Sequence, residues 1–501
     1  MDRSSTKKTQ LDKREWWALF IIIFVSSLIR LKINYSTEFI PGGNGAYYLV
    51  VVRNIFEPGN LVYRDFPLVF WLEAAIALVP FKLGLMDLNA AIDFAVRTFD
   101  SVVPTLSMLP AYYISKKILG NEERLLPKII IASVSVLYVS FFMLISEFQK
   151  NSLGLLWLFS MVYWILKVHE KNNIKNILMV ALFFILTAVT HYGCIAVAIT
   201  IIIVDLIIST VIRFNWKKLY MALLIIAFFG MATILIVNLI NHWRLISLIE
   251  APQKIMRDPV ISYLFIGEPV ISPLDLITIL LVNTVALASL FTYFTKFKLI
   301  ETKLRSFILT MIVLSLFLAS PFLGLETAQR LYFISYLTAL PLLAFIHRET
   351  GTINKRKNIL LIVSAVLLLS TIYNSVRNNY SNMNKTLYAE MTKMKKKLPQ
   401  DEGTLIVARH GMEFWSNWIF RNYSVRQEEL SPSYWRWYNK VYFLIQKKDK
   451  SPFGHAGTFG KPFPEPTIPE NSNLIFSNKY FNLYLSKAVP KDFSIFIKGY
   501  K

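Results

Sequence analysis

Long apolar segments separated by short polar ones occupy most of the first 375 residues of this chain. A membrane-spanning helix needs about 20 apolar residues to cross roughly 30 Å of hydrocarbon. Segments of this kind predict eleven spans, at residues 16–33, 99–115, 128–145, 153–167, 177–190, 194–212, 219–240, 275–294, 306–323, 331–347 and 358–375. The first of them lacks a small-residue cleavage site, so we expect a retained span and not a signal peptide.

A further apolar segment, residues 66–86, is long enough to be considered as a twelfth span. Glu73 lies near its middle, and Pro80 and Lys82 follow. These residues favour a helix that lies in the membrane interface. A twelfth span would also reverse the orientation of every later one.

Lysine and arginine mark one side of the expected membrane helices. Short cytoplasmic loops carry an excess of these residues. With eleven spans, every loop on one side is basic: Arg3, Lys7, Lys8, Lys13 and Arg14; Lys116, Lys117, Arg124 and Lys128; Lys167, Lys171 and Lys175; Arg213, Lys217 and Lys218; Lys296, Lys298, Lys303 and Arg305; Arg348, Lys355, Arg356 and Lys357. We therefore expect a cytoplasmic N-terminus and an external C-terminal segment.

The expected fold class is an all-α polytopic membrane bundle with a small α/β domain. Residues 1–15 form a cytoplasmic basic arm and 16–375 the transmembrane domain, in which 34–98 is a large first outer loop with interfacial helices. Residues 376–501 form the extracytoplasmic domain. There, strands are expected at 404–408, 440–445, 473–476 and 493–498, a helix at 412–420 and a Pro/Gly-rich loop at 451–469.

Composition supports a membrane protein and argues against other classes. The chain is 54% hydrophobic and 17% charged, with a mean hydropathy of +0.46. The net charge of +22 lies largely in the basic loops, so it indicates membrane lipids and not nucleic acid as the partner. Cys194 is the single cysteine, which excludes an intramolecular disulfide. We expect an integral protein of the plasma membrane.

Polar groups cluster where the expected spans emerge on the outside. They are Glu38, Asn44 and Asp65 after the first span, Glu147 and Lys150 after the third, His191 after the fifth, and Glu326 and Arg330 before the tenth. Ionisable groups within hydrocarbon are costly, and Asp205 is the clear acidic case in a span. Pairing with Arg213 or snorkelling would account for it.

The segments Gly42-Gly-Asn-Gly-Ala-Tyr-Tyr-Leu-Val-Val-Val-Arg53, Tyr63-Arg-Asp-Phe-Pro-Leu68 and Glu147-Phe-Gln-Lys-Asn-Ser-Leu-Gly154 resemble outer loops of the GT-C glycosyltransferases. That superfamily includes protein O-mannosyltransferases, lipid A aminoarabinose transferases and oligosaccharyltransferases. The resemblance implies sugar transfer on the extracytoplasmic face, from a polyprenyl-phosphate-linked donor to a lipid, glycan or protein acceptor. A carboxylate takes the acceptor proton, and cations stabilise the phosphate that leaves.

In the resembling family an acidic residue follows the first span, where this chain has Asn44. An amide cannot act as a general base, so Glu38, which we favour, or Asp65 supplies the carboxylate, or the activity has been lost. Asn44 would then orient a sugar hydroxyl or complete a metal shell. Glu147 matches a second acidic site that some members use for a metal, here Mg²⁺ or Mn²⁺, or for the acceptor. The structural alternative is a charge at a helix end.

In the resembling family an arginine near a late span binds the donor phosphate. Arginine suits this role because its planar fork binds two oxygens. Arg330 is the first candidate, although an ion pair with Glu326, four residues earlier, is the structural alternative. His191 and Lys150 are the others, and a lone histidine is often only an interface residue.

Acceptor binding is the remaining role, and aromatic residues of the C-terminal segment are its candidates. His410 and Trp415, with Trp418, Trp435 and Trp437, offer rings on which sugars stack, or else they are core residues. Two other functions stay open. One is a transporter or flippase for a lipid-linked glycan, although midplane ionisable groups are lacking; the other is an inactive relative that serves as an assembly partner.

Overall fold

The computed structural model describes residues 12–57, 63, 65–212, 256–264, 272–377, 380–399, 403–447 and 464–489, and at residue 326 only the backbone. The expected span 219–240 and the expected strand 493–498 lie outside these residues, as do Arg213, most of the N-terminal arm and most of the Pro/Gly-rich loop. The chain forms two compact units. We call them the helical unit (1–30, 101–144 and 150–376) and the mixed unit (31–100, 145–149 and 377–501).

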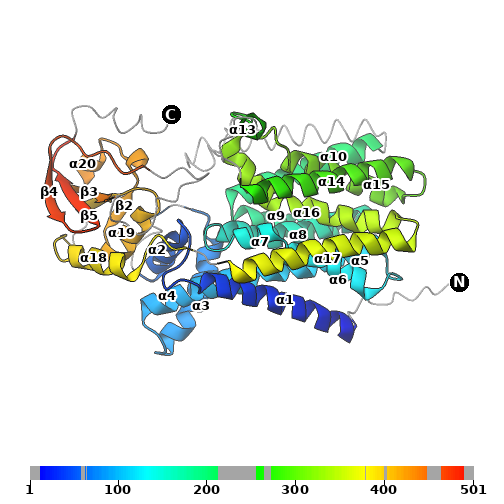
Figure 1. Ribbon diagram of the computed structural model, residues 1–501, viewed down its shortest axis with the longest axis horizontal. Helices are drawn as coiled ribbons and strands as arrows, with labels where there is room; N and C mark the ends of the chain where they lie inside the picture. Colours follow the sequence, from blue (N-terminus) through cyan, green and yellow to red (C-terminus); the bar gives the residue numbers. More distant parts are fainter. Residues whose placement is uncertain are drawn as a thin grey trace. The chain divides into compact units, whose positions relative to one another are not determined.

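The helical unit is a bundle of long helices (Figure 1). Its helices are α1 (Lys13–Asn34, whose last turn belongs to the mixed unit), η1 (Val103–Ser107), α5 (Met108–Leu119), α6 (Leu125–Leu137), α7 (Val139–Met143), α8 (Gln149–Glu170), α9 (Ile174–Ala188), α10 (Tyr192–Ile212), α13 (Val260–Leu264), α14 (Pro273–Thr295), α15 (Thr302–Leu318), α16 (Leu325–Glu349) and α17 (Ile353–Val376). Among the described residues, seven segments are long and apolar enough to cross a membrane: α1, α6 with α7, α8, α10, α14, α16 and α17. Each overlaps an expected span, and the chain is an integral membrane protein.

Three of the other expected spans fall on shorter described elements. Residues 99–115 are divided among the end of a helix, η1 and α5, and Pro104 within η1 lacks the N–H that a continuous helix needs. α9 has 15 residues and α15 has 17, which at 1.5 Å per residue gives lengths of about 23 and 26 Å. The total of eleven spans therefore stays a prediction.

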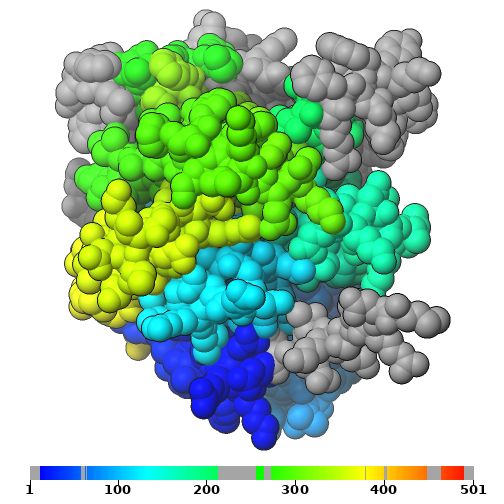
Figure 2. Space-filling model, turned by 90° about the vertical axis from the view of Figure 1, so that its right-hand side faces the viewer, coloured from blue at the N-terminus to red at the C-terminus, as the bar shows by residue number. Residues whose placement is uncertain are grey.

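Basic connections between helices share one end of the helical unit. Four ion pairs join them: Lys116–Glu15, Lys117–Glu170, Arg348–Glu301 and Arg356–Glu123. In Figure 2, surfaces from the α5–α6 region (cyan), the start of α17 (yellow) and the α14–α15 region (green) lie next to one another on this side. These are the connections expected in the cytoplasm. Because these basic connections lie at one end of the helical unit, they agree with the prediction that basic loops share one side of the membrane. Which side faces the cytoplasm stays a prediction.

The mixed unit combines the expected first outer loop with the C-terminal segment. It contains α2 (Gly45–Phe56), α3 (Leu68–Lys82), most of α4 (Leu88–Val102) and α18 (Lys385–Lys395). α3 lies within the expected interfacial segment and has 15 residues. Like α9, it is shorter than the about 20 residues of a typical span, and its interfacial position stays a prediction. Its Glu73 is fully buried among α3 residues that include Val69, Phe70 and Ala77.

A five-stranded sheet forms the rest of the mixed unit. Its strands are β1 (Thr404–Val407), β2 (Tyr423–Val425), β3 (Lys440–Gln446), β4 (Ser472–Ser477) and β5 (Phe481–Ser486), in the order β2-β1-β3-β5-β4. β1 pairs in parallel with β2 and β3, and β5 pairs antiparallel with β3 and β4. The expected strands at 404–408, 440–445 and 473–476 are confirmed, as is the helix at 412–420, which is α19 (Met412–Phe420). β2 and β5 are additional.

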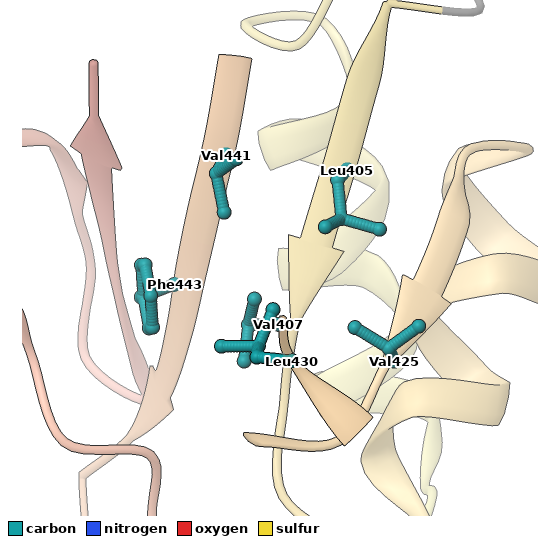
Figure 3. Close-up of a cluster of buried hydrophobic side chains, with 6 residues drawn as sticks. All are labelled: Leu405, Val407, Val425, Leu430, Val441 and Phe443. Carbon is teal, nitrogen blue, oxygen red and sulfur yellow. The ribbon is translucent and has the colours of Figure 1, made fainter. Parts of the chain in front are cut away.

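The core of this sheet explains why β1 is apolar from Leu405 to Val407. All four residues of β1 are buried, as expected for a strand with parallel neighbours on both sides. Figure 3 shows the cluster on one face: Leu405, Val407, Val425, Leu430, Val441 and Phe443. The short helices η2 (Gln427–Glu429) and α20 (Tyr434–Trp437) connect β2 to β3, and the aromatic rings of Tyr434 and Trp435 pack against the cluster.

Candidate active site

The loop at residues 40–44 follows α1 and leads into α2. It is held by residues that follow α17: Gly42 N–H donates to the Tyr380 carbonyl (2.9 Å) and the Ser381 hydroxyl donates to the Ile40 carbonyl (2.9 Å). Gly42 has a φ of +85°, a conformation that favours glycine. The loop is therefore fixed at both its start and its turn by the 380–381 backbone and side chain.

The carboxylate of Glu147 binds this loop through three N–H donors. Its Oε2 accepts from Gly43 N (2.6 Å) and Asn44 N (3.1 Å), and its Oε1 accepts from Asn44 Nδ2 (2.7 Å). Asn44 is the residue before the first turn of α2, where N–H groups lack helical partners and a negative charge is favoured. A Cβ atom on Gly42 would lie 2.7 Å from Oε2, so a larger residue here would displace the Glu147 carboxylate. We call this arrangement the Asn44–Glu147 node.

Buried polar contacts fix the backbone that carries Glu147. Ser146 has a φ of +63°, and its N–H donates to Asp100 Oδ2 (2.9 Å). Asn34 Nδ2 donates to the same oxygen (3.0 Å). Arg97, on α4, donates to the carbonyls of Asn34 and Thr37 (2.7 and 3.0 Å). Glu147 is thus presented from a rigid turn.

The turn between β1 and α19 lies against the same loop. Gly411, with a φ of +85°, would place a Cβ atom 3.0 Å from the Gly43 carbonyl and 2.8 Å from Asn382 Nδ2. Asn382 is 2% exposed and its Nδ2 has no hydrogen-bond partner among the described residues. His410 Nδ1 lies 2.9 Å from Glu413 Oε1, and Glu413 is 1% exposed. Amide, imidazole and carboxylate groups therefore border the loop.

Asp65 joins this site through Tyr47, in the first turn of α2. The Tyr47 hydroxyl donates to Asp65 Oδ2, and the Phe66 N–H donates to Oδ1 (2.7 Å). The Tyr47 ring packs on Phe414 of α19, with centroids 5.1 Å apart. Nearby, burial raises the pKa of Tyr63 well above its usual value, and the charge of Glu413 raises it further.

Glu38, the carboxylate favoured from the sequence, lies elsewhere. Its side chain is half exposed and pairs with Lys385 at 3.2 Å, while its carbonyl accepts from Arg97 (2.8 Å). Within the described residues, no hydrogen bond or ion pair joins its carboxylate to the Asn44–Glu147 node.

Arg53, the last residue of the motif that begins at Gly42, is buried at the other end of α2. Its guanidinium donates to the Trp418 carbonyl (2.7 Å) and to the Asn417 carbonyl and side chain (3.0 Å each). It also stacks over the Trp418 ring at 4.7 Å. Burial lowers the pKa of Arg53 to about 9, and repulsion by Arg421 contributes. Its role is to cap the last turn of α19.

The tryptophans proposed for acceptor binding are mostly structural. Trp415 is 1% exposed and packs edge-on against Phe39. Trp418 is 9% exposed beneath Arg53, and Trp435 packs on the sheet core. Trp437 is 69% exposed, so of these four rings it is the one that offers a free face to a sugar.

In the helical unit, two of the three basic candidates, Arg330 and His191, both contact Tyr192. Arg330 Nη1 donates to the Tyr192 hydroxyl (2.8 Å), and the Tyr192 ring lies 4.8 Å from that of His191. Lys150 lies in the first turn of α8, and this helix packs closely on α10 at Gly154, where an added Cβ atom would clash with Cys194 Sγ. These residues lie at or near the N-terminal ends of α8, α10 and α16, which attract anions. We call them the basic cluster. The alternative partner of Arg330, the Glu326 side chain, is outside the described residues.

Asp205 has a partner that sequence reasoning missed. Its carboxylate accepts from or pairs with His169 Nε2 (2.9 Å) and accepts from the Thr310 hydroxyl (3.1 Å). His169 Nδ1 in turn lies 3.2 Å from the Ser306 hydroxyl. The polar groups at 169, 306 and 310 lie on α8 and α15, so this buried network joins helices that are distant in sequence.

A divalent ion does not fit the donor set around Glu147. Among the described residues, no three His, Cys, Asp or Glu side chains gather as metal ligands. The neighbours of the Glu147 carboxylate are N–H donors, which repel a cation.

Solved structures of the oligosaccharyltransferase from Archaeoglobus fulgidus share the fold. The apo form aligns with a TM-score of 0.57 over 86% of this chain and 70% of its own, at 11% identity. The form tethered with an acceptor peptide containing the NVT sequon aligns with a TM-score of 0.52 over 82% and 64%, at 10% identity. The complex with an inhibitory peptide and a dolichol-phosphate, in which the protein is named AglB, aligns with a TM-score of 0.51. The alignment covers 82% of this chain and 64% of that protein, at 11% identity.

This chain thus spans about two thirds of the length of those proteins. At such low identity the likeness shows the fold alone, and that fold is GT-C-like. No protein-family profile and no curated protein sequence matches the chain.

Proposed function

We propose that this chain is a membrane glycosyltransferase that moves a sugar from a polyprenyl-phosphate-linked donor to a lipid, glycan or protein acceptor on the extracytoplasmic face. The basic cluster is the observation that carries this proposal, because Lys150, His191 and Arg330 combine three cationic or hydrogen-bonding groups with helix N-termini. A phosphate monoester or diester is the anion that such a site suits. The fold supports the same reading, since a solved structure with this fold holds a dolichol-phosphate.

The proposed chemistry is a displacement at the anomeric carbon of the sugar. The acceptor atom forms a bond to that carbon, the bond from the carbon to the phosphate oxygen breaks, and the lipid phosphate leaves with the electron pair. Arg330, His191 and Lys150 stabilise the negative charge that develops on the phosphate. The acceptor proton passes to a carboxylate.

We assign the carboxylate base to Asp65 in place of Glu38. Asp65 is attached through Tyr47 to the first turn of α2, and Tyr47 N–H donates to the Asn44 carbonyl (3.0 Å). Glu38 is half exposed with Lys385, so its charge is screened and its position weakly fixed. His410, held by Glu413, borders the same loop and is assigned to acceptor binding.

Asp65→Asn is therefore expected to lower transfer at least about 100-fold, because an amide cannot take the acceptor proton. Lipid-linked sugars extracted from cells that carry the variant, the unaltered protein or no protein would be compared by mass spectrometry. The substrate lipid-linked sugar should accumulate in the variant as it does without the protein. Glu38→Gln is the matched control and should behave as the unaltered protein. The reverse pattern would assign the base to Glu38.

Arg330→Ala tests the phosphate site. Loss of a bidentate donor to a charged oxygen is expected to raise the donor KM or lower kcat/KM by about 10- to 100-fold, the range for a charge-assisted hydrogen bond. Arg330→Lys keeps the positive charge but loses the planar fork of the guanidinium. Its kcat/KM should therefore lie between those of the unaltered protein and Arg330→Ala. Transfer from the purified polyprenyl-phosphate sugar in membranes is the measurement. Arg257→Ala, at another exposed arginine of the helical unit, is the control. Equal rates for all three variants would exclude Arg330 from donor binding.

A catalytically inactive relative that serves as an assembly partner is the second candidate. The observation that favours it is that Glu147, Asp65, Glu38 and Glu413 each already have hydrogen-bond or ion-pair partners. In that case no lipid-linked sugar accumulates when the protein is removed, and Asp65→Asn changes nothing.

A further inference from the structure

The Asn44–Glu147 node raises two questions. The first is how the negative charge of Glu147 is neutralised, and the second is whether a substitution at Asn44 would let the node bind a metal ion. A carboxylate that is partly buried needs a partner of opposite charge or several hydrogen-bond donors. Glu147 has three donors, two from the backbone of residues 43 and 44 and one from the Asn44 amide. They satisfy both of its oxygens.

We propose that the Asn44 amide and the loop backbone take the place of a divalent cation at Glu147, so that the node of the unaltered chain is stable without Mg²⁺ or Mn²⁺, and that Asn44→Asp alone converts the node into a divalent-cation site. An N–H donor and a cation compete for the same lone pairs of a carboxylate. Oε1 is occupied by Asn44 Nδ2, and Oε2 by two backbone N–H groups. Oε1 is therefore the oxygen whose partner a substitution can change.

The distance between the two side chains supports the second half of this proposal. Asn44 Nδ2 lies 2.7 Å from Glu147 Oε1. An aspartate oxygen in the Nδ2 position would stand close to the separation of about 3 Å between neighbouring oxygen ligands of an octahedral ion with bonds of 2.0–2.1 Å. Mg²⁺ and Mn²⁺ sites commonly use one or two carboxylates and complete the shell with water or phosphate oxygens.

Without a cation, Asn44→Asp brings two carboxylates together. Their repulsion opposes the fold of the loop, and a divalent ion relieves it. The backbone donors at 43 and 44 are unchanged by this substitution, so they keep Oε2 in place. The variant is therefore expected to need a metal ion for full stability, whereas the unaltered chain is not.

The test uses the full chain purified in detergent, with Mn²⁺ as the probe. Binding is measured by loss of the free Mn²⁺ paramagnetic resonance signal, and stability by thermal unfolding with and without EDTA. The unaltered chain should bind no Mn²⁺ at this node, and its Tm should be the same in EDTA and in Mn²⁺. Asn44→Asp should bind one Mn²⁺ at least about tenfold more tightly than Asn44→Ala. Its Tm should fall in EDTA and recover with Mn²⁺.

Two controls keep the result interpretable. Asn44→Ala removes the amide without adding a carboxylate, and the double variant Asn44→Asp with Glu147→Gln should lose the Mn²⁺ that the single variant gains. Mn²⁺ bound by the unaltered chain and lost in Glu147→Gln would overturn the first half of the proposal. A folded Asn44→Asp chain that binds no Mn²⁺ would overturn the second. Neither measurement depends on sugar transfer, so the outcome is independent of the proposed function.

Discussion

Glu147→Ala is expected to abolish sugar transfer and to destabilise the mixed unit more than any other single change in the loop region. The substitution removes the acceptor for three N–H groups at once, two of them on the backbone of the turn that begins α2. Hydrogen bonds to a charged group contribute about 1.5–3 kcal/mol each, although such values are not additive. We therefore expect the free energy of unfolding to fall by about 3 kcal/mol. Transfer should fall at least about 100-fold, because the misplaced loop carries Asn44 and leads to Tyr47.

The measurements are chemical unfolding of the purified chain in detergent and transfer in membranes. The stability and the transfer rate of Glu147→Gln should lie between those of the unaltered chain and Glu147→Ala, because the glutamine carbonyl oxygen still accepts hydrogen bonds but carries no charge. Glu38→Ala is the matched control: it also removes a mixed-unit glutamate, but one in an exposed ion pair with Lys385. Such a pair contributes about 0–1 kcal/mol. A loss from Glu147→Ala no larger than that of Glu38→Ala would show that the carboxylate does not hold the loop.

The membrane helices could be predicted because hydropathy is a local property. α1, α10, α14 and α17 are long, continuous and apolar, and each lies where the sequence places a span. The segment 99–115 shows the limit of this reasoning. Its composition is apolar, but Pro104 lies in a 3₁₀ turn that separates α5 from the helix before it. Hydropathy does not register the missing N–H that divides the segment.

The candidate site could be predicted only as separate groups. Asn44 and Glu147 each stand out as polar residues at the ends of spans, but they are 103 residues apart, and no sequence pattern indicates that they bond. The choice between Glu38 and Asp65 likewise depends on which carboxylate Tyr47 reaches. Asp205 pairs with His169, 36 residues away, whereas the sequence suggested snorkelling or a pair with Arg213, eight positions along the same segment.

Some missed elements left a signal and others did not. In β5, Phe481, Leu483 and Leu485 are buried, and this alternation is typical of a strand with one face on a core. β2 has three residues, too few for an alternation to be recognised. Asn382 left a weak signal, because it lies in the polar segment that follows the last expected span, where other candidate polar residues also lie. For Trp415 the sequence left acceptor binding and a core position open, because an aromatic residue in an amphipathic helix gives the same pattern whether it faces a ligand or the core.

Arg53→Ala is expected to be the largest stability change at the far end of α2. The last carbonyls of a helix lack internal partners. In α19 the Trp418 carbonyl accepts from Arg53, and the Asn417 carbonyl accepts both from Arg53 and from the N–H of Arg421 (3.0 Å). The alanine takes the donor away from the Trp418 carbonyl and leaves a cavity beneath the Trp418 ring, whereas the Asn417 carbonyl keeps the N–H of Arg421. Burying the Arg53 cation is itself unfavourable, as its pKa of about 9 indicates, so its removal offsets part of the loss in the free energy of unfolding. The net loss in the free energy of unfolding is therefore about 3 kcal/mol, and not the sum of every broken contact.

Trp418 is a built-in probe of this change, because its ring lies directly under the guanidinium in the folded chain. Unfolding in urea followed by tryptophan fluorescence should show a lower midpoint for Arg53→Ala. Arg53→Lys should be intermediate, because a lysine ammonium cannot reproduce the fork that reaches both Asn417 and Trp418. Arg436→Ala, at an exposed arginine of α20, should change the unfolding free energy by less than about 0.5 kcal/mol. If Arg53→Ala were as mild as Arg436→Ala, the helix-capping role would be wrong, and the arginine at the end of the Gly42–Arg53 motif would have to be explained by function instead of by folding.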